Sequence, residues 1–266
     1  MKMYQIDSFT DEIFAGNPAA VCLLEDGWLQ EETMQKIAAE NNLSETAFVC
    51  LKDMYIRWFT PVAEVGLCGH ATLAAAHALF FHEGISQQEL VLNSKTGKLK
   101  VSKDEQDKNL LCLDFPKDTI KQITFEDKLD CFNFKPKEVW QGREEYVLVF
   151  ETEEEVKNAV CNLEKAKNID LSGFIITAWS GRKENNEDID YVLRYFSPKY
   201  GIDEDPVTGS AQTLLVPYWQ QKTNKTTFNV RQISARGGKL MCRDAGERVL
   251  IAGKAVTFFE GKVVTC

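Results

Sequence analysis

The sequence lacks the features that mark several large classes of protein. None of its apolar runs reaches the 18 residues of a membrane-spanning helix, and its beginning carries no apolar segment of signal-peptide length. Basic residues are fewer than acidic ones, 31 against 40 among 266 residues, which gives a net charge of −9. Such a surface disfavours nucleic acid and anionic membranes as partners. We therefore expect a cytoplasmic protein with neither kind of partner.

Histidines and paired cysteines are scarce too. There are three histidines, and none of the eight cysteines lies in a Cys-x-x-Cys pair. This spacing disfavours a structural zinc site and a disulfide framework, so buried free thiols are the expected state. His77 shares a predicted helical face with His70, but His82 does not. We expect packing or surface roles for His77 and His82, and no metal site.

An internal repeat is the most informative feature of the chain. Residues 57–61, Arg-Trp-Phe-Thr-Pro, recur as residues 194–198, Arg-Tyr-Phe-Ser-Pro. Gly69 recurs as Gly209, each followed by one residue and then alanine, and a Gly-Lys-Leu sequence closes each copy. Three matches in the same order predict two domains of one topology.

Hydrophobic periodicity predicts short strands and a few helices in each half. An apolar run follows each repeated glycine, over 71–81 and 211–219, and is typical of a buried helix. Residues 116–137 carry two prolines and many lysines and are expected to connect the halves. The other expected elements are strands over 3–9, 19–24, 48–51, 55–59, 90–92, 99–101, 110–115, 146–150, 173–179 and 191–196, helices over 31–40 and 153–165, and a solvated loop over 183–190.

The repeated glycines indicate where a ligand binds. A helix start offers free backbone N–H groups and a partial positive charge, and glycine lets a ligand approach the backbone closely. If the two halves face each other, Gly69 and Gly209 lie at two helix starts on one cleft. This suits a small carboxylate, or a substrate that develops negative charge during reaction. The alternative is that these glycines only serve tight turns.

Four residues near these loops are candidates for proton transfer. His70 lies in the first turn of its predicted helix, where a neutral imidazole is favoured. Glu45 enters an apolar strand between two hydroxyl residues, where burial would suit an acid/base group. Asp205 and Ser210 flank the second glycine. Simpler interpretations stay open: a surface glutamate for Glu45, an Asp-Pro turn for Asp205, and a first-turn hydroxyl for Ser210.

The second half offers no counterpart of Glu45. Its matching segment, residues 169–175, carries the same Leu-Ser pair but no glutamate after it. A mechanism with a single acid/base predicts this pattern, in which the functional residue occurs in one half only.

The motifs together resemble the PhzF family, the phenazine-biosynthesis-like isomerases. They occur in the order typical of that family and span residues 16–211. The segments that carry the resemblance are Gly16-Asn17-Pro18-Ala19-Ala20-Val21, Ser44-Glu45-Thr46-Ala47-Phe48, Arg57-Trp58-Phe59-Thr60-Pro61, Glu64-Val65-Gly66-Leu67-Cys68-Gly69-His70-Ala71-Thr72 and Glu204-Asp205-Pro206-Val207-Thr208-Gly209-Ser210-Ala211.

The resemblance implies a diaminopimelate-epimerase-like fold of class α+β. Two similar domains from an internal duplication would each wrap a curved, mostly antiparallel sheet or barrel around a central helix. The halves would be residues 1–116 and 117–254, with the last strand, near 255–266, a candidate to return to the first half. The resemblance also implies a homodimer without metal or organic cofactor.

The family's functional residues fall on matching positions of this chain. The resemblance implies Glu45 as acid/base, with His70, Asp205 and Ser210 as supporting catalytic residues. Substrate-binding positions are Gly69, Gly209, Thr208 and Asn17. We therefore expect an isomerase that moves a proton between carbons of a small carboxylate metabolite.

Two alternatives remain. An amino-acid epimerase or racemase of the same fold would use two facing thiols, but only Cys68 is present and Thr208 stands at the second position. Threonine is too weak an acid to replace a thiol. The other alternative is a carboxylate-binding protein without turnover.

Overall fold

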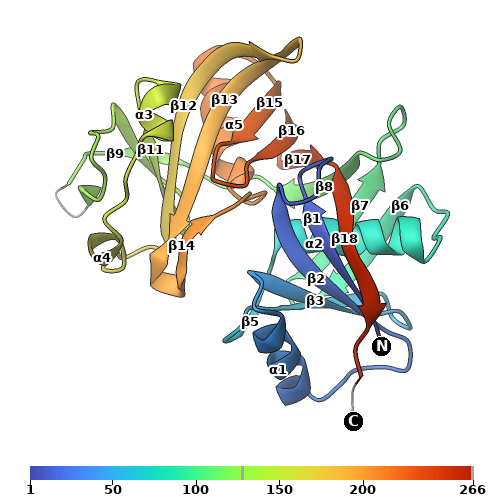
Figure 1. Cartoon of the computed structure of the whole chain (residues 1–266). Helices are drawn as coiled ribbons and strands as arrows, with labels where there is room; N and C mark the ends of the chain where they lie inside the picture. The colour runs from blue at the N-terminus through green and yellow to red at the C-terminus, as the bar shows by residue number, and fades with distance from the viewer. Residues whose placement is uncertain (127–128, 265–266) are drawn as a thin grey trace. The chain divides into compact units, whose positions relative to one another are not determined.

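The same order of strand pairings occurs twice in the computed structural model, which describes residues 1–126 and 129–264. The chain divides into unit 1, Met1–Asp114 with Ala252–Cys266, and unit 2, Phe115–Ile251. It passes from one unit to the other within β8 (Leu111–Pro116) and returns within β17 (Arg248–Gly253). Figure 1 traces both passages.

Unit 1 is built on β1 and its neighbours. β1 pairs antiparallel with both β2 and β18, β2 pairs parallel with β3, and β3 pairs antiparallel with β4. β4 then pairs with β5 and, in parallel, with β6. Besides β8, its elements are β1 (Lys2–Ser8), β2 (Asn17–Leu24), α1 (Glu31–Asn41), β3 (Glu45–Cys50), β4 (Tyr55–Phe59), β5 (Glu64–Val65), α2 (Gly69–His77), the π-helical turn η1 (Ala78–His82), β6 (Glu89–Ser94), β7 (Gly97–Lys103) and β18 (Ala255–Lys262).

Unit 2 repeats this plan. β10 pairs antiparallel with β9 and β11, β11 parallel with β12, β12 antiparallel with β13, and β13 with β14 and, in parallel, with β15. Besides β17, its elements are β9 (Lys121–Ile123), β10 (Glu138–Gln141), β11 (Glu145–Val149), α3 (Glu153–Lys157), α4 (Leu163–Ala166), β12 (Gly173–Glu184), β13 (Glu187–Ser197), the 3₁₀ turn η3 (Pro198–Tyr200), β14 (Ile202–Asp205), α5 (Gln212–Thr223), β15 (Thr227–Gln232) and β16 (Gly238–Asp244).

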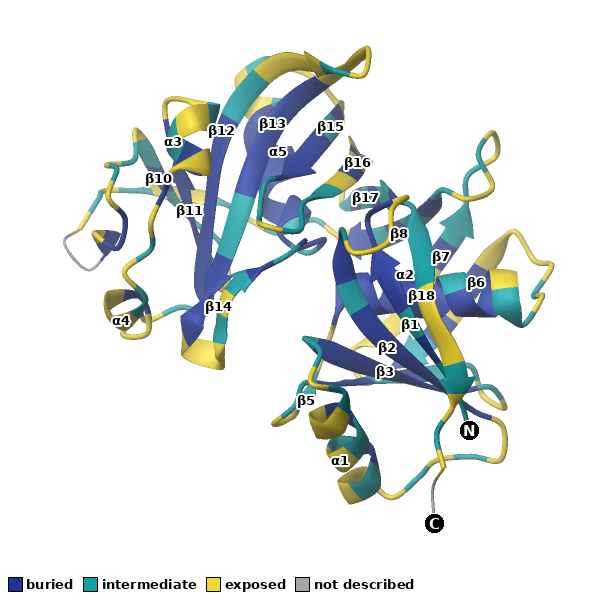
Figure 2. Ribbon diagram, in the orientation of Figure 1, coloured by how far each residue is buried: buried dark blue, intermediate teal, exposed yellow. Residues whose placement is uncertain are grey.

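Each unit has one central, largely buried helix, as the apolar runs predict. Residues 69–76 of α2 are all buried, and the helix packs on β1, β2, β3 and β18. In α5 the side chains of Tyr218 and Trp219 are buried, and the Trp219 indole N–H donates to Thr177 of β12. Figure 2 shows both helices in the colour of buried residues. The expected α+β fold of two similar domains is confirmed.

The repeated pentapeptide ties each sheet to the loop before the glycine. Arg57 donates two hydrogen bonds to Glu64 of β5, at 2.7 and 2.8 Å, and lies over the Phe59 ring. Arg194 forms the same pair with Glu204 of β14, at 2.7 and 2.8 Å. Bidentate arginine–carboxylate pairs fix geometry as well as charge. The duplicated arginine therefore anchors the short strand that leads to each glycine loop.

Two of the expected elements were wrong in unit 2. The helix expected over 153–165 is two short helices, α3 and α4, because Thr152 and Asn162 each cap a new helix start with their side chains. The loop expected over 183–190 is the end of a β12–β13 hairpin, whose turn residues Asn185 and Asn186 both have positive φ.

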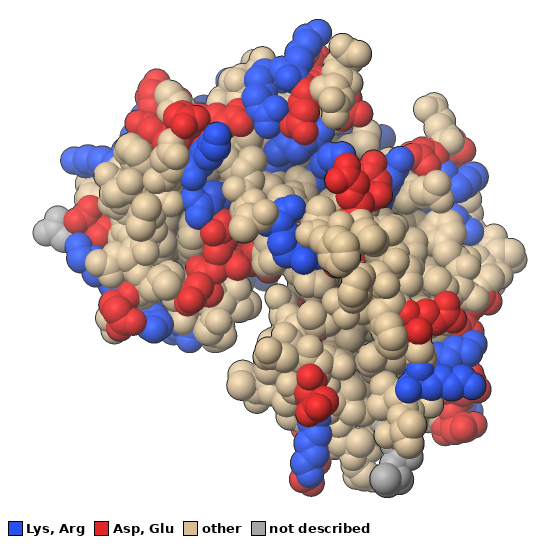
Figure 3. All heavy atoms as spheres, in the orientation of Figure 1, with Lys and Arg blue, Asp and Glu red and all other residues tan. Residues whose placement is uncertain are grey.

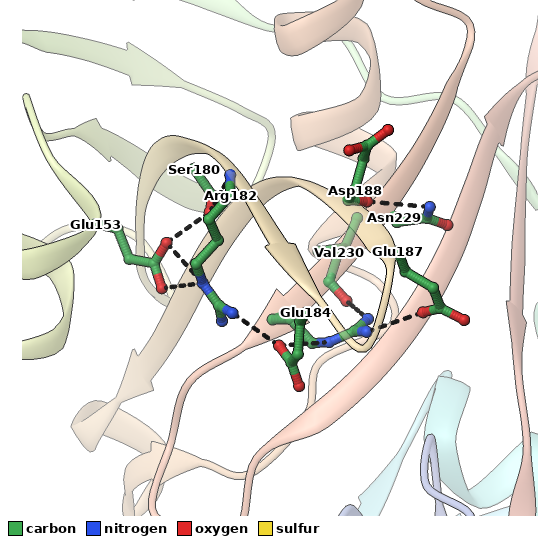
Figure 4. Close-up of polar contacts among 9 residues, drawn as sticks. Glu153, Ser180, Arg182, Glu184, Glu187, Asp188, Asn229 and Val230 are labelled. Atoms are coloured by element: carbon green, nitrogen blue, oxygen red, sulfur yellow. Dashed lines mark hydrogen bonds and ion pairs between the residues drawn. The ribbon is translucent and has the colours of Figure 1, made fainter.

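Apart from Ile189, which packs in the core, this hairpin end is supported by ion pairs, and this explains the missing periodicity. Arg182 pairs with Glu153 and Glu184, as Figure 4 shows. Arg231 of β15 pairs with Glu187. A charged segment can thus extend as a two-stranded ribbon.

The surface and the thiols complete the description. On the face drawn in Figure 3, acidic and basic side chains are interspersed. Of the described helices, none has the length and hydropathy that a membrane crossing requires. The described cysteines are free thiols; Cys112 and Cys161 are half-buried and the others are buried, while Cys266 lies outside the described residues.

Candidate active site

Glu45 is the first residue of β3, at the edge of the buried region of unit 1. Its neighbour in the register is Ala19 of β2, and only 9% of its surface is exposed. The next residue, Thr46, accepts a hydrogen bond from the Asn41 side chain at 3.0 Å. This bond ties the start of the strand to the end of α1. The carboxylate is therefore held by a strand rather than placed on a mobile surface loop.

His70 meets Glu45 from the first turn of α2. Its Nε2 lies 3.2 Å from Glu45 Oε2, and its Nδ1 lies 3.2 Å from the Asn17 side-chain amide nitrogen. If the amide donates to Nδ1, the ring proton is on Nε2, the nitrogen that faces the Glu45 carboxylate. Burial lowers the pKa of His70 to about 3, so the ring is neutral at ordinary pH.

The first turn of α2 is fixed by two hydroxyl groups. The Ser8 hydroxyl donates to the His70 carbonyl at 2.8 Å, and the Thr72 hydroxyl donates to the Cys68 carbonyl at 2.5 Å. Cys68 itself has an extended backbone and stands just before the helix. The N–H groups of the first helical residues, starting at Gly69, are those that a helix leaves for an external acceptor. Unit 1 therefore has, beside Glu45, a braced helix start of the kind that can bind an anion.

The Cys68 thiol adds a third reactive group. Its Sγ lies 3.5 Å from Nδ1 and 3.9 Å from Nε2 of His70, and the residue is 7% exposed. One possible metal-ligating atom from each of Glu45, Cys68 and His70 lies within 4.8 Å of the other two. Sequence reasoning placed His70 and Glu45 in one site but did not foresee this three-residue cluster.

In unit 2, a buried polar network holds Asp205 and Thr208. The Thr208 hydroxyl donates to the Asp205 carboxylate, while the Thr208 N–H donates to Gln232 Oε1 at 2.7 Å. Gln232 Nε2 donates to the Asp205 carbonyl at 2.8 Å. The Tyr191 hydroxyl donates to Gln212, which stands at the start of α5. Gln232 and Gln212 are positioning residues that no sequence motif indicated, since they lie on separate elements.

Gly209 and Ser210 lie in a tight turn that precedes α5. The N–H groups of Gln212 and Thr213 donate back to Gly209 and Ser210, at 3.1 and 3.0 Å. Ser210 is half-buried, whereas Asp205 and Thr208 are each 7% exposed. Four of the predicted residues, Asp205, Thr208, Gly209 and Ser210, are thus neighbours within unit 2.

The register explains where a counterpart of Glu45 would stand. The first pair of the parallel β2–β3 strands is Ala19 with Glu45, and the first pair of the parallel β11–β12 strands is Glu145 with Gly173. Gly173 therefore occupies the position of Glu45. A Cβ added there would lie 2.4 Å from the carbonyl oxygen of Phe196. Unit 2 accordingly has no side chain at this position.

One strand away, unit 2 carries a carboxyl group that the sequence did not single out. Glu145 is half-buried, and its Oε1 lies 3.4 Å from the Tyr195 hydroxyl. Tyr195 pairs with Asp205 across β13 and β14. Burial, followed by the charges of Glu144 and Asp118, raises the pKa of Glu145 to about 7. In the sequence this residue looks like one of two adjacent surface glutamates.

The other two histidines lie outside these clusters. His77 Nε2 and His82 Nε2 contact the Thr257 hydroxyl of β18, at 3.2 and 2.7 Å. Both rings are half-buried. His77 ends α2 and His82 ends η1, whereas His70 lies in the first turn of α2.

The comparison with known families matches almost the whole chain. The sequence profile of the phenazine biosynthesis-like family, PhzC-PhzF, covers residues 6–261. The chain belongs to this family. The resemblance inferred from the motifs is thus confirmed.

Members of the family from distant organisms align over their full length with this chain. An uncharacterized isomerase of Pseudomonas aeruginosa is 42% identical over 266 residues, covering 99% of this chain and 98% of the relative. A human phenazine biosynthesis-like domain-containing protein is 34% identical, with 98% of both chains covered. The crystal structure of a PhzF-family protein from Enterococcus faecalis is 40% identical with a TM-score of 0.92, and 99% of each chain is covered.

The fold extends beyond the family. A hydroxyproline epimerase from Agrobacterium vitis, solved with trans-4-hydroxy-L-proline bound, has a TM-score of 0.58 at 12% identity, covering 98% of this chain and 91% of the epimerase. At that identity the likeness shows the fold alone. It establishes the epimerase-like fold expected from the sequence.

Proposed function

We propose that this PhzF-family protein is a cofactor-independent isomerase in which Glu45 moves a proton between carbons of a small carboxylate. The observation that carries the proposal is the buried Glu45–His70 contact at 3.2 Å beside the start of α2. The curated relatives include proteins named isomerases, which supports this class of reaction.

The proton transfer needs three roles. The Glu45 carboxylate takes a proton from an activated carbon and returns it to a different carbon of the same molecule, so no other reactant is consumed. The N–H groups from Gly69 onward hold the substrate carboxylate or the negative charge that develops on it. Neutral His70, held by Asn17, contacts the Glu45 carboxylate through Nε2 at 3.2 Å and restricts the positions open to it. His70 and the start of α2 are held by hydrogen bonds, and Glu45 is held as the first residue of β3.

Unit 2 carries the other residues that the sequence predicts for this reaction. Asp205, whose carboxylate accepts from Thr208, and Ser210 would orient the substrate or relay its proton. Gly209 would supply a second set of backbone donors. That one substrate contacts these residues and Glu45 together stays a prediction.

A substrate search in heavy water tests this proposal. Small carboxylates that raise the melting temperature of the protein would be incubated with it in D₂O and followed by NMR. We expect deuterium to enter one carbon while hydrogen is lost from another. A compound that binds without any C–H exchange would instead favour a carboxylate-binding protein, and the proposed reaction would be wrong for it.

An epimerase is the second candidate, because the Cys68 thiol lies 3.5 Å from His70. Two facing thiols would be needed, and the position matching Cys68 in unit 2 is Thr208, whose hydroxyl donates to Asp205. An epimerase would exchange the proton of one stereocentre and invert it, and Cys68→Ala would abolish this. Isomerisation that survives Cys68→Ala would exclude the thiol mechanism.

We also propose that the protein is a homodimer. Phe14, Phe258 and Phe259 are 65%, 45% and 45% exposed in unit 1, and the rings of Phe14 and Phe258 are 5.5 Å apart. Exposed apolar patches of this kind mark contact surfaces. Light scattering should give twice the 30.2 kDa chain mass, and Phe258→Ser with Phe259→Ser should lower it to one chain. A wild-type mass of one chain would contradict the proposal.

A further inference from the structure

Glu45, Cys68 and His70 combine three kinds of metal ligand in one buried cluster. Among the described residues, theirs is the one group of this kind. His70 Nε2 lies 3.2 Å from Glu45 Oε2 and 3.9 Å from Cys68 Sγ. Ligands of a tetrahedral Zn²⁺ are separated by about 3.3 Å for nitrogen and oxygen and about 3.6 Å for nitrogen and sulfur, given the usual bond lengths. Both distances are close to these values, and the ligand atoms of Glu45 and Cys68 lie within 4.8 Å of each other, so modest side-chain rotations can bring all three to one ion.

We propose that Glu45, Cys68 and His70 bind a soft divalent cation such as Zn²⁺ or Cd²⁺ and that this ion blocks the site. A thiolate and an imidazole select Zn²⁺ and Cd²⁺ over Mg²⁺ and Ca²⁺. Three protein ligands leave the fourth position to water. Binding of the ion stands on this geometry alone, whereas its inhibitory effect rests on the proposed role of Glu45.

Hydrogen bonds from neighbouring residues hold Cys68 and His70 in place. Ser8 and Thr72 fix the turn that carries Cys68 and His70, through hydrogen bonds to the His70 and Cys68 carbonyls. Asn17 holds the other ring nitrogen of His70. Partners of this kind orient ligands and raise metal affinity. Unit 2 has Gly173 and Thr208 at the positions of Glu45 and Cys68, so it offers no matching site in its described residues.

Binding changes the proton content of the cluster in a defined way. The thiol proton of Cys68 passes to solvent as the metal–sulfur bond forms, because the thiolate is the ligand. The imidazole stays neutral: its proton moves from Nε2, which binds the ion, to Nδ1. The Asn17 amide then turns so that its oxygen accepts this proton. No oxidant or reductant is involved, and Glu45 can no longer accept a proton from a substrate.

Titration of the metal-free protein with Cd²⁺ tests the proposal without any substrate. We expect one ion per chain and a thiolate-to-cadmium absorption band. Cys68→Ser should lose the band, and Glu45→Gln should weaken binding by about tenfold or more. Cys112→Ser, which removes a half-buried thiol of the same unit, should bind like the wild type. Excess Mg²⁺ should not compete.

A second measurement, alkylation of the cysteines, keeps the outcome decisive. If Cys68→Ser does not fold, Cd²⁺ should still protect Cys68 of the wild-type protein from alkylation while Cys112 is modified at an unchanged rate. A wild type without the band, a band that persists in folded Cys68→Ser, or absent protection of Cys68 would overturn the proposal. These results do not depend on proton exchange, so a failure of the proposed isomerase function would be recognised separately.

Discussion

The buried carboxyl group of Glu145 makes the stability of the protein depend on pH in a predictable direction. Its pKa is about 7 in the folded protein, against an ordinary glutamate value of 4.5, and burial is the largest cause of the rise. The folded state therefore binds the Glu145 proton more tightly than the unfolded state. This contribution to stability is fully present below about pH 4.5 and is lost as the pH rises to about 7.

The change in the free energy of unfolding follows from the rise in the pKa of Glu145. A difference of about 2.5 pKa units corresponds to about 3 kcal/mol as an upper value, since each unit is worth about 1.4 kcal/mol. Glu145 is half-buried, so solvent screening reduces this to about 1–2 kcal/mol. Glu145→Gln removes the charge and can keep the contact with Tyr195. We expect the variant to be more stable than the wild type by about this amount above pH 7.

Urea unfolding of both proteins at pH 8 and pH 4.5 measures the effect. The advantage of Glu145→Gln should be present at pH 8 and close to zero at pH 4.5. Glu144→Gln removes an equal charge from an exposed neighbour and should give a smaller gain at pH 8, because Glu144 acts on Glu145 only through its charge. A variant that is no more stable than the wild type at pH 8 would refute a desolvated Glu145.

Four further substitutions probe the parts that position the site. Glu204→Gln and Glu64→Gln each break one copy of the bidentate arginine pair. We expect each to lower the free energy of unfolding in urea by about 1–2 kcal/mol. A loss for only one of the two variants would contradict the duplicated role. Gly173→Ala forces β12 away from the Phe196 carbonyl. The melting temperature should fall, because the free energy of unfolding drops by about 2 kcal/mol or more. An unchanged melting temperature would show that the strand can shift without loss of stability. Gln232→Leu removes the side chain that bonds the buried Thr208 N–H and the Asp205 carbonyl. The free energy of unfolding, measured in the same way, should fall by about 2 kcal/mol or more. An unchanged free energy would mean that the network does not stabilise the fold.

The sequence predicted the duplication because the repeated residues have local tasks. Arg57 and Arg194 bind a carboxylate seven and ten residues further on, and each glycine precedes a buried helix. Such short-range relations leave a visible pattern. The charged end of the β12–β13 hairpin was missed because its ion pairs are with Glu153 of α3 and Arg231 of β15, which lie far away in the sequence and leave no periodicity.

The candidate site was predictable only in part, for a related reason. The motifs indicated Glu45, His70 and Asp205, which lie in recognisable sequence contexts. Gln232 and Glu145 were missed, because each meets the site through pairing between strands distant in the chain. The absence of a glutamate after Ser172 could be read from the sequence, but its physical reason, the close approach of the Phe196 carbonyl to Gly173, required the structure.

The most direct test of the central claim is the rate of solvent deuterium incorporation into a confirmed ligand by wild-type protein, Glu45→Gln and Glu40→Gln. Glu40 is an exposed glutamate of α1, five residues before Glu45, and serves as the charge-matched control. We predict that Glu45→Gln lowers the rate by about 10²-fold or more, while Glu40→Gln leaves it unchanged. Exchange by folded Glu45→Gln at the wild-type rate would contradict the assignment of Glu45 as the acid/base.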